Sequence, residues 1–149
     1  MVKFLFPLIL LGFAFTPLTH SPKEITWLDM ETAIKKAKKT KQPIFVDVYT
    51  SWCGWCKKMD KATFADPAVA QYVAKNYLAV KLNAESQETI KFGKENLTAR
   101  ALAKERFAVK GYPTIVLLSP DLQKIQAKGG FKDADAFVKM LQKFKQKSD

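Results

Sequence analysis

Continuous apolar runs mark the expected strands of this sequence. Residues 44–49, 78–82 and 114–118 are rich in β-branched and other apolar side chains and carry at most one charge each. Runs without polar alternation are typical of strands that are covered on both faces. Weaker runs at residues 25–27 and 124–128 predict a short first strand and an edge strand.

Apolar side chains spaced three and four residues apart predict the helices. These helices are expected at residues 30–39, 57–64, 68–76, 98–107 and 133–145. Asp29 and Thr98 stand where N-caps are expected, and Asp66 is followed by Pro67, which suits the first position of a helix.

The order of these elements predicts the fold class. Strands and helices alternate through most of the chain, which favours parallel strands with helical crossovers, and the last two strands are close enough to form a hairpin. The prediction is an α/β fold with a central mixed β-sheet flanked by helices on both faces. Residues 85–97 are polar without a clear period, and they are expected to be a loop or a poorly formed helix.

The first residues follow a different pattern. Lys3 precedes an apolar run at residues 4–15, which is shorter than the roughly 20 residues that span a bilayer. The pattern predicts a signal peptide over residues 1–21 and one folded domain over residues 22–149. No Ala-x-Ala cleavage motif follows the run, so an uncleaved N-terminal anchor is the alternative. Either way, the protein is expected to be exported, to the periplasm or cell envelope.

The strong positive charge narrows the classes of partner. The chain has 25 Lys and Arg against 14 Asp and Glu, a formal net charge of +11. The lysines are scattered along amphipathic stretches and only two arginines occur, which favours a solvated basic face over nucleic-acid binding. Attraction to acidic partners or anionic membrane surfaces stays open.

The two cysteines are better explained by chemistry than by architecture. Cys53 and Cys56 follow a predicted buried strand and open a predicted helix. A bridge across so small a loop adds little stability. A sulfur at a helix N-terminus faces unpaired N–H groups that stabilise a thiolate, which is the nucleophile in disulfide exchange. Cys53 is therefore expected to attack, and Cys56, one turn further and more shielded, to resolve the mixed disulfide.

Metal and haem sites find little support. A structural zinc site needs about four ligands, and the chain offers two cysteines and His20. Covalent haem attachment needs a histidine directly after the second cysteine, where Lys57 stands. No metal and no cofactor are expected.

Two motifs resemble those of the thioredoxin superfamily. Residues 45–58, with Trp52-Cys53-Gly54-Trp55-Cys56 at their centre, resemble its active-site segment, in the form found in exported bacterial thioredoxin-like proteins. Residues 111–114, Gly-Tyr-Pro-Thr, are similar to its cis-proline loop. The likeness covers roughly residues 25–144 and implies the thioredoxin fold.

The resemblance gives Asp47 and Lys81 catalytic roles. Asp47 matches the buried acid that carries a proton to and from the resolving cysteine, and Lys81 matches its lysine partner. The residues themselves agree, because a carboxylate in an apolar strand is costly unless it is paired or protonated, and burial raises its pKa. The alternatives are a strand-end Asp47 that reaches water and a Lys81 that extends into solvent.

Further residues are expected to bind the substrate. The resemblance implies a cis peptide bond before Pro113 and main-chain pairing of Tyr112 with the substrate; the alternative is an ordinary trans turn. Trp52, Gly54 and Trp55 are the other members of this group: Gly54 and Trp55 stand between the cysteines, and Trp52 precedes Cys53. Trp52 is expected to be a surface aromatic or else to pack against the sheet edge.

The implied activity is thiol–disulfide exchange with protein thiols and disulfides. Thioredoxins carry Gly-Pro between the cysteines, whereas this chain carries Gly54-Trp55, and that dipeptide tunes the reduction potential. Reductases, oxidases and isomerases share these residues, so the direction stays open. A membrane electron donor or acceptor is a possible partner, and a monomer is expected. The competing interpretation is a non-catalytic thioredoxin-fold module that binds clients in the manner of a chaperone.

One segment is longer than in thioredoxins. Residues 83–97 are expected to be a neutral insertion, with a role in partner choice as the alternative.

Overall fold

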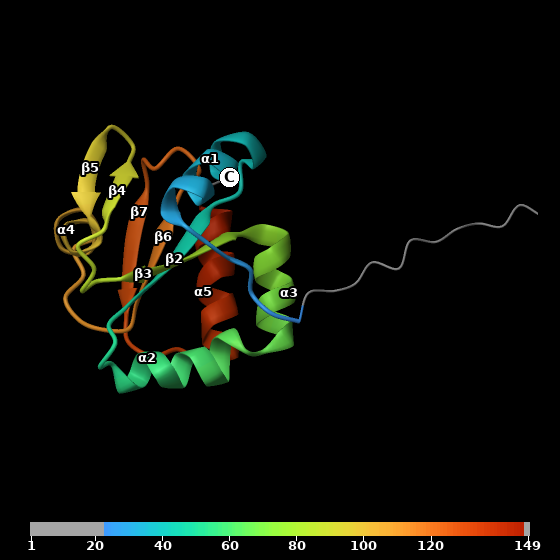
Figure 1. Cartoon of the computed structure of the whole chain (residues 1–149). Coiled ribbons are helices and arrows are strands. Elements are labelled where there is room, and N and C mark those ends of the chain that lie inside the picture. The colour runs from blue at the N-terminus through green and yellow to red at the C-terminus, as the bar shows by residue number, and fades with distance from the viewer. Residues whose placement is uncertain (1–22, 148–149) are drawn as a thin grey trace, which may run out of the picture.

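A five-stranded mixed sheet forms the centre of the computed structural model, which describes residues 23–147 (Figure 1). The strand order is β1-β3-β2-β6-β7. β1 and β2 run parallel to β3, whereas β6 runs antiparallel to both β2 and β7. The strands are β1 Trp27–Leu28, β2 Ile44–Tyr49, β3 Leu78–Asn83, β6 Thr114–Leu118 and β7 Ile125–Gly129. The predicted α/β fold is confirmed, while the predicted signal peptide over residues 1–21 and His20 lie outside the described residues.

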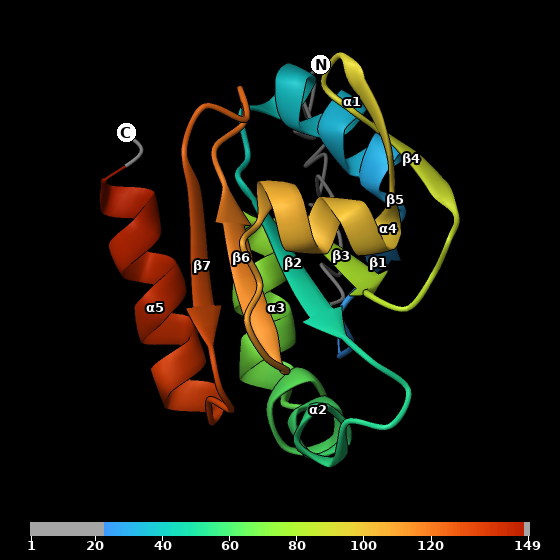
Figure 2. The same cartoon turned by 90° about the vertical axis from the view of Figure 1, so that its left-hand side faces the viewer.

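Helices cover both faces of the sheet (Figures 1 and 2). One face packs on α1 and the α4 region, and the other on α3 and α5. The helices are α1 Met30–Thr40, α2 Gly54–Met59, α3 Pro67–Asn76, α4 Ala99–Ala101 and α5 Ala134–Gln146. Two π-helical turns prolong α2 and α4, and they are η1 Asp60–Phe64 and η2 Leu102–Arg106. None of the helices in residues 23–147 is long and apolar enough to span a membrane.

The period-two alternation of β2 divides its side chains between two cores. Ile44, Val46 and Val48 join the core under α1, whereas Phe45 joins the core under α3 and α5. By the same alternation, Asp47 lies on the face of Phe45. The register places Asp47 opposite Lys81 of β3. The sheet therefore brings these two charged residues together inside an apolar layer.

The predicted helix starts are confirmed by their caps. The Asp29 carboxylate accepts a hydrogen bond from the Thr32 N–H at 2.8 Å, and Asp66 accepts from the Ala68 N–H at 2.7 Å. Thr98 caps α4 by accepting from the Ala101 N–H at 3.1 Å. The helix expected at residues 57–64 begins earlier, at Gly54, directly after Cys53.

The prediction for residues 85–97 was wrong. The segment contains a two-stranded antiparallel hairpin, β4 Thr89–Phe92 and β5 Glu95–Thr98. Gly93, with φ +65°, turns the chain between the strands. Phe92 is buried and packs edge-on against Phe107, with ring centroids 5.5 Å apart. The hairpin therefore contributes to the core beside α1.

Candidate active site

The two cysteines lie at the start of α2, where β2 ends. Cys53 is the N-cap of the helix, and its sulfur accepts a hydrogen bond from the Cys56 N–H at 3.1 Å. The two form a disulfide with their Cα atoms 5.3 Å apart. The Cys53 sulfur therefore lies at the helix N-terminus and accepts from an N–H of the first turn, which is an arrangement that stabilises a thiolate.

Burial does not distinguish the two cysteine residues. Cys53 and Cys56 are each 4% exposed in the disulfide form, so the expectation that Cys56 is the more shielded one was wrong. The neighbouring side chains contrast with them, since Trp52 is 68% and Trp55 57% exposed. What distinguishes Cys53 is its position at the helix cap.

The loop before β6 meets the cysteine end of the sheet. The Tyr112–Pro113 peptide bond is cis, as predicted. Because β2 and β6 are antiparallel, with Val48 opposite Thr114, Pro113 lies at the end of the sheet from which β2 leads to Cys53. The Trp52 and Tyr112 rings meet edge-on with centroids 5.9 Å apart, which confirms Trp52 as a surface aromatic of this end.

A second aromatic pair extends the same surface. The Trp55 ring lies 5.6 Å from the Phe131 ring, and the Lys58 ammonium stands 4.7 Å from the Trp55 centroid. Gly54 is exposed between the cysteines, with no heavy atom within 4 Å of where a Cβ would stand. The disulfide is thus bordered by exposed aromatic and cationic groups.

Asp47 is a buried carboxyl with one close cation. It is 2% exposed, and the Lys81 ammonium lies 3.3 Å from its Oδ2. Burial raises the pKa of Asp47 to about 6, the nearby Asp60 charge raises it further, and Lys81 opposes both. Among the described residues, Asp47 Oδ1 has no hydrogen-bond partner. A carboxyl with that pKa is able to gain and release a proton near neutral pH.

Lys81 bridges two carboxylates. Its ammonium forms ion pairs with Asp47 and Asp60 and lies 5.1 Å from the ring centroids of both Trp27 and Tyr49. Burial by itself would lower the pKa of Lys81, but Asp60 and Asp47 together raise it. Lys81 is therefore held in the site rather than extended into solvent.

Asp60 was missed by the sequence reasoning. It is half-exposed on η1. It shares the Lys81 ammonium with Asp47, and its negative charge raises the pKa of Asp47. One signal was available, because Asp60 lies four residues after Cys56 and so on the same helical face.

Glu85 was missed as well. Its carboxylate accepts hydrogen bonds from both the N–H and the hydroxyl of Ser51, each at 2.7 Å. These bonds, that from the Ser51 N–H foremost, lower the pKa of Glu85. Glu85 therefore anchors the loop that carries Trp52 and Cys53.

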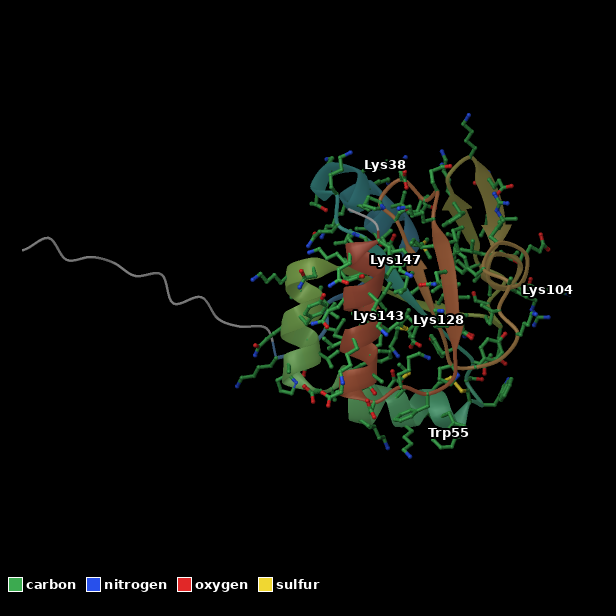
Figure 3. The ribbon with its side chains drawn as sticks, turned by 180° about the vertical axis from the view of Figure 1, so that it is seen from behind. Lys38, Trp55, Lys104, Lys128, Lys143 and Lys147 are labelled. Carbon is green, nitrogen blue, oxygen red and sulfur yellow. A yellow bond between two sulfur atoms is a disulfide. The ribbon has the colours of Figure 1, made fainter. Side chains whose placement is uncertain are left out.

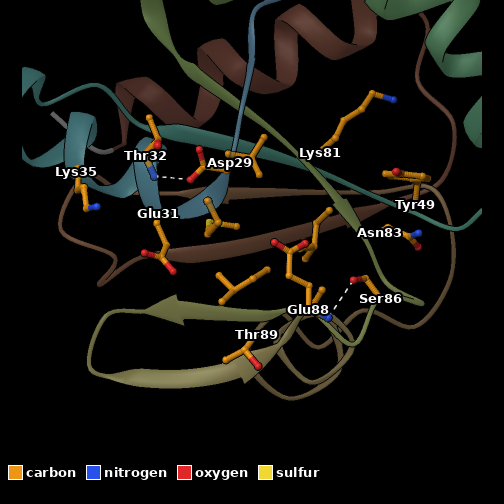
Figure 4. Close-up of a pocket in the computed structure, with 15 residues that line it drawn as sticks. Asp29, Glu31, Thr32, Lys35, Tyr49, Lys81, Asn83, Ser86, Glu88 and Thr89 are labelled. Carbon is orange, nitrogen blue, oxygen red and sulfur yellow. Dashed lines mark hydrogen bonds between the residues drawn. The ribbon is translucent and has the colours of Figure 1, made fainter.

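A large cavity elsewhere does not belong to this site. About 520 Å³ lies between α1, β3 and the hairpin, with Asp29, Glu31 and Glu88 at its walls (Figure 4). It meets the site at Lys81 and at the neighbouring Tyr49, and the Lys81 side chain points away from Glu31 and Glu88 in Figure 4. Within residues 23–147, no three His, Cys, Asp or Glu side chains are grouped to bind a metal ion.

The comparison with known families decides the identity of the fold. The sequence profile of the thioredoxin-like domain matches residues 30–145. This chain belongs to the thioredoxin-like family. Its residues 30–145 include both cysteines, Asp47, Lys81 and the cis-proline loop, so the family match and the geometry cover the same site.

Relatives of this thioredoxin-like chain include disulfide interchange proteins. Over 121 residues, 78% of the chain, it is 34% identical to the thiol:disulfide interchange protein DsbD of Pectobacterium atrosepticum. Among solved structures, the oxidised C-terminal domain of DsbD from Neisseria meningitidis has a TM-score of 0.55 and 25% identity, covering 79% of this chain and 98% of that domain. A thioredoxin of Thermus thermophilus shares the fold, with a TM-score of 0.68 and 20% identity, over 84% of this chain and 90% of that one.

The thioredoxin-like chain matches only a part of its longer relatives. It spans 18% of the Pectobacterium protein and 14% of an uncharacterized Caenorhabditis elegans protein, to which it is 31% identical over 109 residues, 72% of the chain. The likeness therefore concerns one domain of those proteins.

Proposed function

We propose that this chain is a thiol–disulfide oxidoreductase that exchanges disulfides with client proteins. The observation that carries the proposal is the Cys53–Cys56 disulfide at a helix start, at the sheet end where the cis Tyr112–Pro113 bond lies. The DsbD relatives and the structural likeness to the oxidised C-terminal domain of DsbD support it.

In the reductive direction, the reaction has two displacements. The Cys53 thiolate attacks one sulfur of a client disulfide, forms a bond to it, and releases the other client sulfur as a thiolate. Cys56 then attacks the Cys53 sulfur, which forms the Cys53–Cys56 disulfide and releases the second client thiolate. Two electrons pass from the dithiol to the client, and the oxidative direction is the same sequence reversed.

Asp47 serves as the proton acceptor and donor for Cys56. The resolving thiol must lose a proton to attack, and a buried carboxyl with a pKa of about 6 accepts one near neutral pH. Lys81 steadies the carboxylate that is left when the proton departs. Asp60 is a positioning residue, since it holds Lys81 and acts on Asp47 through it.

The exposed groups around the disulfide bind the client. The main chain of Tyr112 pairs with the client backbone beside Pro113, while the exposed Trp52 and Trp55 give apolar contacts next to the cysteines. Gly54 leaves the space between the sulfurs and the client open.

The proposal includes a cellular location and a redox partner. The basic and apolar pattern of residues 1–21 supports export to the periplasm or cell envelope, where the chain works as a monomer. Repeated turnover needs a supply or a sink of electrons, and a membrane-bound donor or acceptor fills that need. The relation to DsbD supports such a partner.

Reduction of insulin by dithiothreitol tests the proposal. The wild type is expected to accelerate insulin precipitation, and Cys53→Ala to leave only the uncatalysed rate. Equal activity of both proteins would overturn the enzyme proposal. Retained binding of unfolded ribonuclease by an inactive wild type would favour the client-binding module instead.

A further inference from the structure

The outer edge of β7 leaves main-chain groups unpaired within the described residues. The Gly130 N–H donates to the Pro113 carbonyl at 2.8 Å, and the Ser119 N–H donates to the Lys124 carbonyl at 3.0 Å. Since hydrogen-bonded positions of an antiparallel ladder recur every second residue, Gln126 and Lys128 also face β6. The main-chain groups of Ile125, Ala127 and Gly129 therefore point outward. Four of the five β7 residues are exposed, and no other strand of residues 23–147 pairs with this edge.

The lysine side chain of residue 132 covers only the end of this edge. The Lys132 ammonium donates hydrogen bonds to the carbonyls of Gly129 and Gly130, each at 2.9 Å. The N–H and C=O groups of Ile125 and Ala127 stay available. An exposed edge of this kind pairs with an extended chain from another protein.

Two grooves flank the edge, one on each face of the sheet. On the α5 side, a groove of about 420 Å³ is lined by Gln126 and Lys128 of β7 and by one face of α5. On the other side, a second groove of about 420 Å³ is lined by Ala127, Gly129 and the loop of residues 108–112. An added strand would direct alternate side chains into these two grooves.

The groove on the α5 side has only one sign of charge. Its charged residues are Lys128, Lys139, Lys143 and Lys147, and none of its lining residues is acidic. Figure 3 shows Lys128 of β7 on the same face as Lys143 and Lys147 of the α5 end. At the end of β7, burial and then the charge of Lys128 lower the pKa of Lys132.

The fold itself does not require this arrangement. Lys139, Lys143 and Lys147 are spaced four residues apart, so their like charges repel along one helical face. Lysines in the last turn also complement the negative end of the helix, but Lys139 and Lys128 stand outside that turn. Lysines on an edge strand also discourage pairing between copies of a protein. Both effects favour an acidic partner over a second copy of this basic chain.

We infer that β7 is a docking edge for an extended acidic segment of a partner protein. The segment pairs with the main chain of Ile125 and Ala127 and directs carboxylates towards the lysines of the α5 groove. An anionic membrane is the weaker match, because a planar surface supplies no alternating donors and acceptors for the edge. This inference does not rest on the redox reaction, since β7 contains none of the residues assigned to it.

Binding of two labelled peptides to the full chain tests the inference. One peptide alternates valine and glutamate over eight residues, and the other carries lysine in place of glutamate. The glutamate peptide is expected to bind at least tenfold more tightly, as measured by fluorescence anisotropy at low salt. It should slow amide exchange at Ile125 and Ala127 more than at Gln126 and Lys128. Equal binding of both peptides, or none by the glutamate peptide, would overturn the inference.

Ala127→Pro removes an outward N–H without breaking a bond to β6. It is expected to weaken glutamate-peptide binding at least tenfold, while Ala127→Val, which keeps the N–H, binds like the wild type. A far-ultraviolet circular dichroism spectrum and a urea unfolding transition like those of the wild type would show that Ala127→Pro folds. The double variant Lys139→Glu/Lys143→Glu should lose the preference for the glutamate peptide.

Two further results would contradict the docking edge. Undiminished peptide binding by Ala127→Pro would overturn strand pairing. Binding of phosphatidylglycerol vesicles by the wild type and Ala127→Pro alike, without peptide binding, would assign the basic face to a membrane. The variant Cys53→Ser/Cys56→Ser should bind the glutamate peptide as the wild type does. Its binding therefore tests the docking edge independently of the proposed redox reaction.

Discussion

At the scale of single residues, Asp47 is a buried carboxyl of β2 that forms an ion pair with Lys81. Asp47 has a pKa of about 6 because burial disfavours its charged form more than the Lys81 cation favours it. A group with a pKa of about 6 is able to take up and release a proton near neutral pH. This proton affinity has a cost, since the native state must hold a buried charge once that proton is gone.

The stability of the oxidised protein should therefore depend on Asp47 in a defined pH window. The carboxyl titrates near 3.8 when unfolded and near 6 when folded, so between these values the folded state binds more protons. Its stabilising contribution is complete below about pH 4 and is lost as pH rises through about 6. Relative to wild type, Asp47→Asn should gain roughly 2–3 kcal/mol of unfolding free energy between pH 4 and pH 8.

Urea unfolding across that range measures the gain. Asp135→Asn, which removes an exposed carboxylate of α5, is the control and should show little change. A pH-independent difference between Asp47→Asn and wild type would contradict the assigned ionisation.

Asp60 should tune the proton affinity of Asp47. Its negative charge raises the pKa of Asp47, and it shares the Lys81 ammonium. Asp60→Asn removes that charge and leaves Lys81 to Asp47 alone, so the pKa of Asp47 should fall below about 6 in a ¹³C-carboxyl NMR titration. Asp66→Asn, a helix-cap variant on the next helix, is the matched control. An unchanged or higher pKa in Asp60→Asn would remove Asp60 from the site.

At the scale of elements, two long-range anchors hold the loop before α2 and the hairpin. Glu85 directly follows Ala84 and β3, and it binds Ser51 of the cysteine loop across 34 positions of sequence. The hairpin places Phe92 in the core beside Phe107. Both anchors come from the segment that the sequence pattern described least well.

Loss of the Glu85 anchor should loosen the cysteine loop. In Glu85→Ala, the Ser51 N–H loses its acceptor, and its amide hydrogen exchange should speed up about three- to tenfold. Glu88→Ala, which removes an exposed carboxylate of the same segment, serves as control. Unchanged exchange at Ser51 would show that the contact is not maintained in solution.

The hairpin should contribute to global stability. Phe92→Ala removes a buried ring and is expected to cost about 3–5 kcal/mol of unfolding free energy, measured in urea. Phe92→Leu should cost less than about 1.5 kcal/mol, because it keeps most of the buried volume. A negligible cost for Phe92→Ala would instead support the interpretation of the segment as a neutral insertion.

Some of these elements are predictable from the sequence and others are not, for physical reasons. β2, β3 and β6 were predictable because strands buried on both faces are continuously apolar. The hairpin was not, since its strands are only four residues long, half of their residues are exposed, and Phe92 is the one that is fully buried. In the site, the cysteines, Asp47, Lys81 and the cis bond at Pro113 could be placed in advance. Asp60 and Glu85 are charged, partly exposed residues that matter only through distant partners.

At the scale of the whole molecule, the two proposed functions involve different surfaces. The sheet end with the disulfide is bordered by Trp52 and Trp55, whereas the lysines of α5 and β7 cover an adjoining face (Figure 3). Part of the net charge of +11 is thus concentrated in one groove, whereas the sequence pattern predicted only a basic face. The α5 lysines are predictable from helical spacing, but Lys128 joins them only through the sheet.

Capture of the mixed disulfide tests the central claim most directly. Cys56→Ala cannot resolve the intermediate, so incubation of the reduced variant with oxidised insulin should yield a covalent complex whose mass-mapped bond joins Cys53 to an insulin cysteine. Cys53→Ala, treated in the same way, should yield little or none. Absence of the complex from Cys56→Ala, or equal amounts from both variants, would contradict the account.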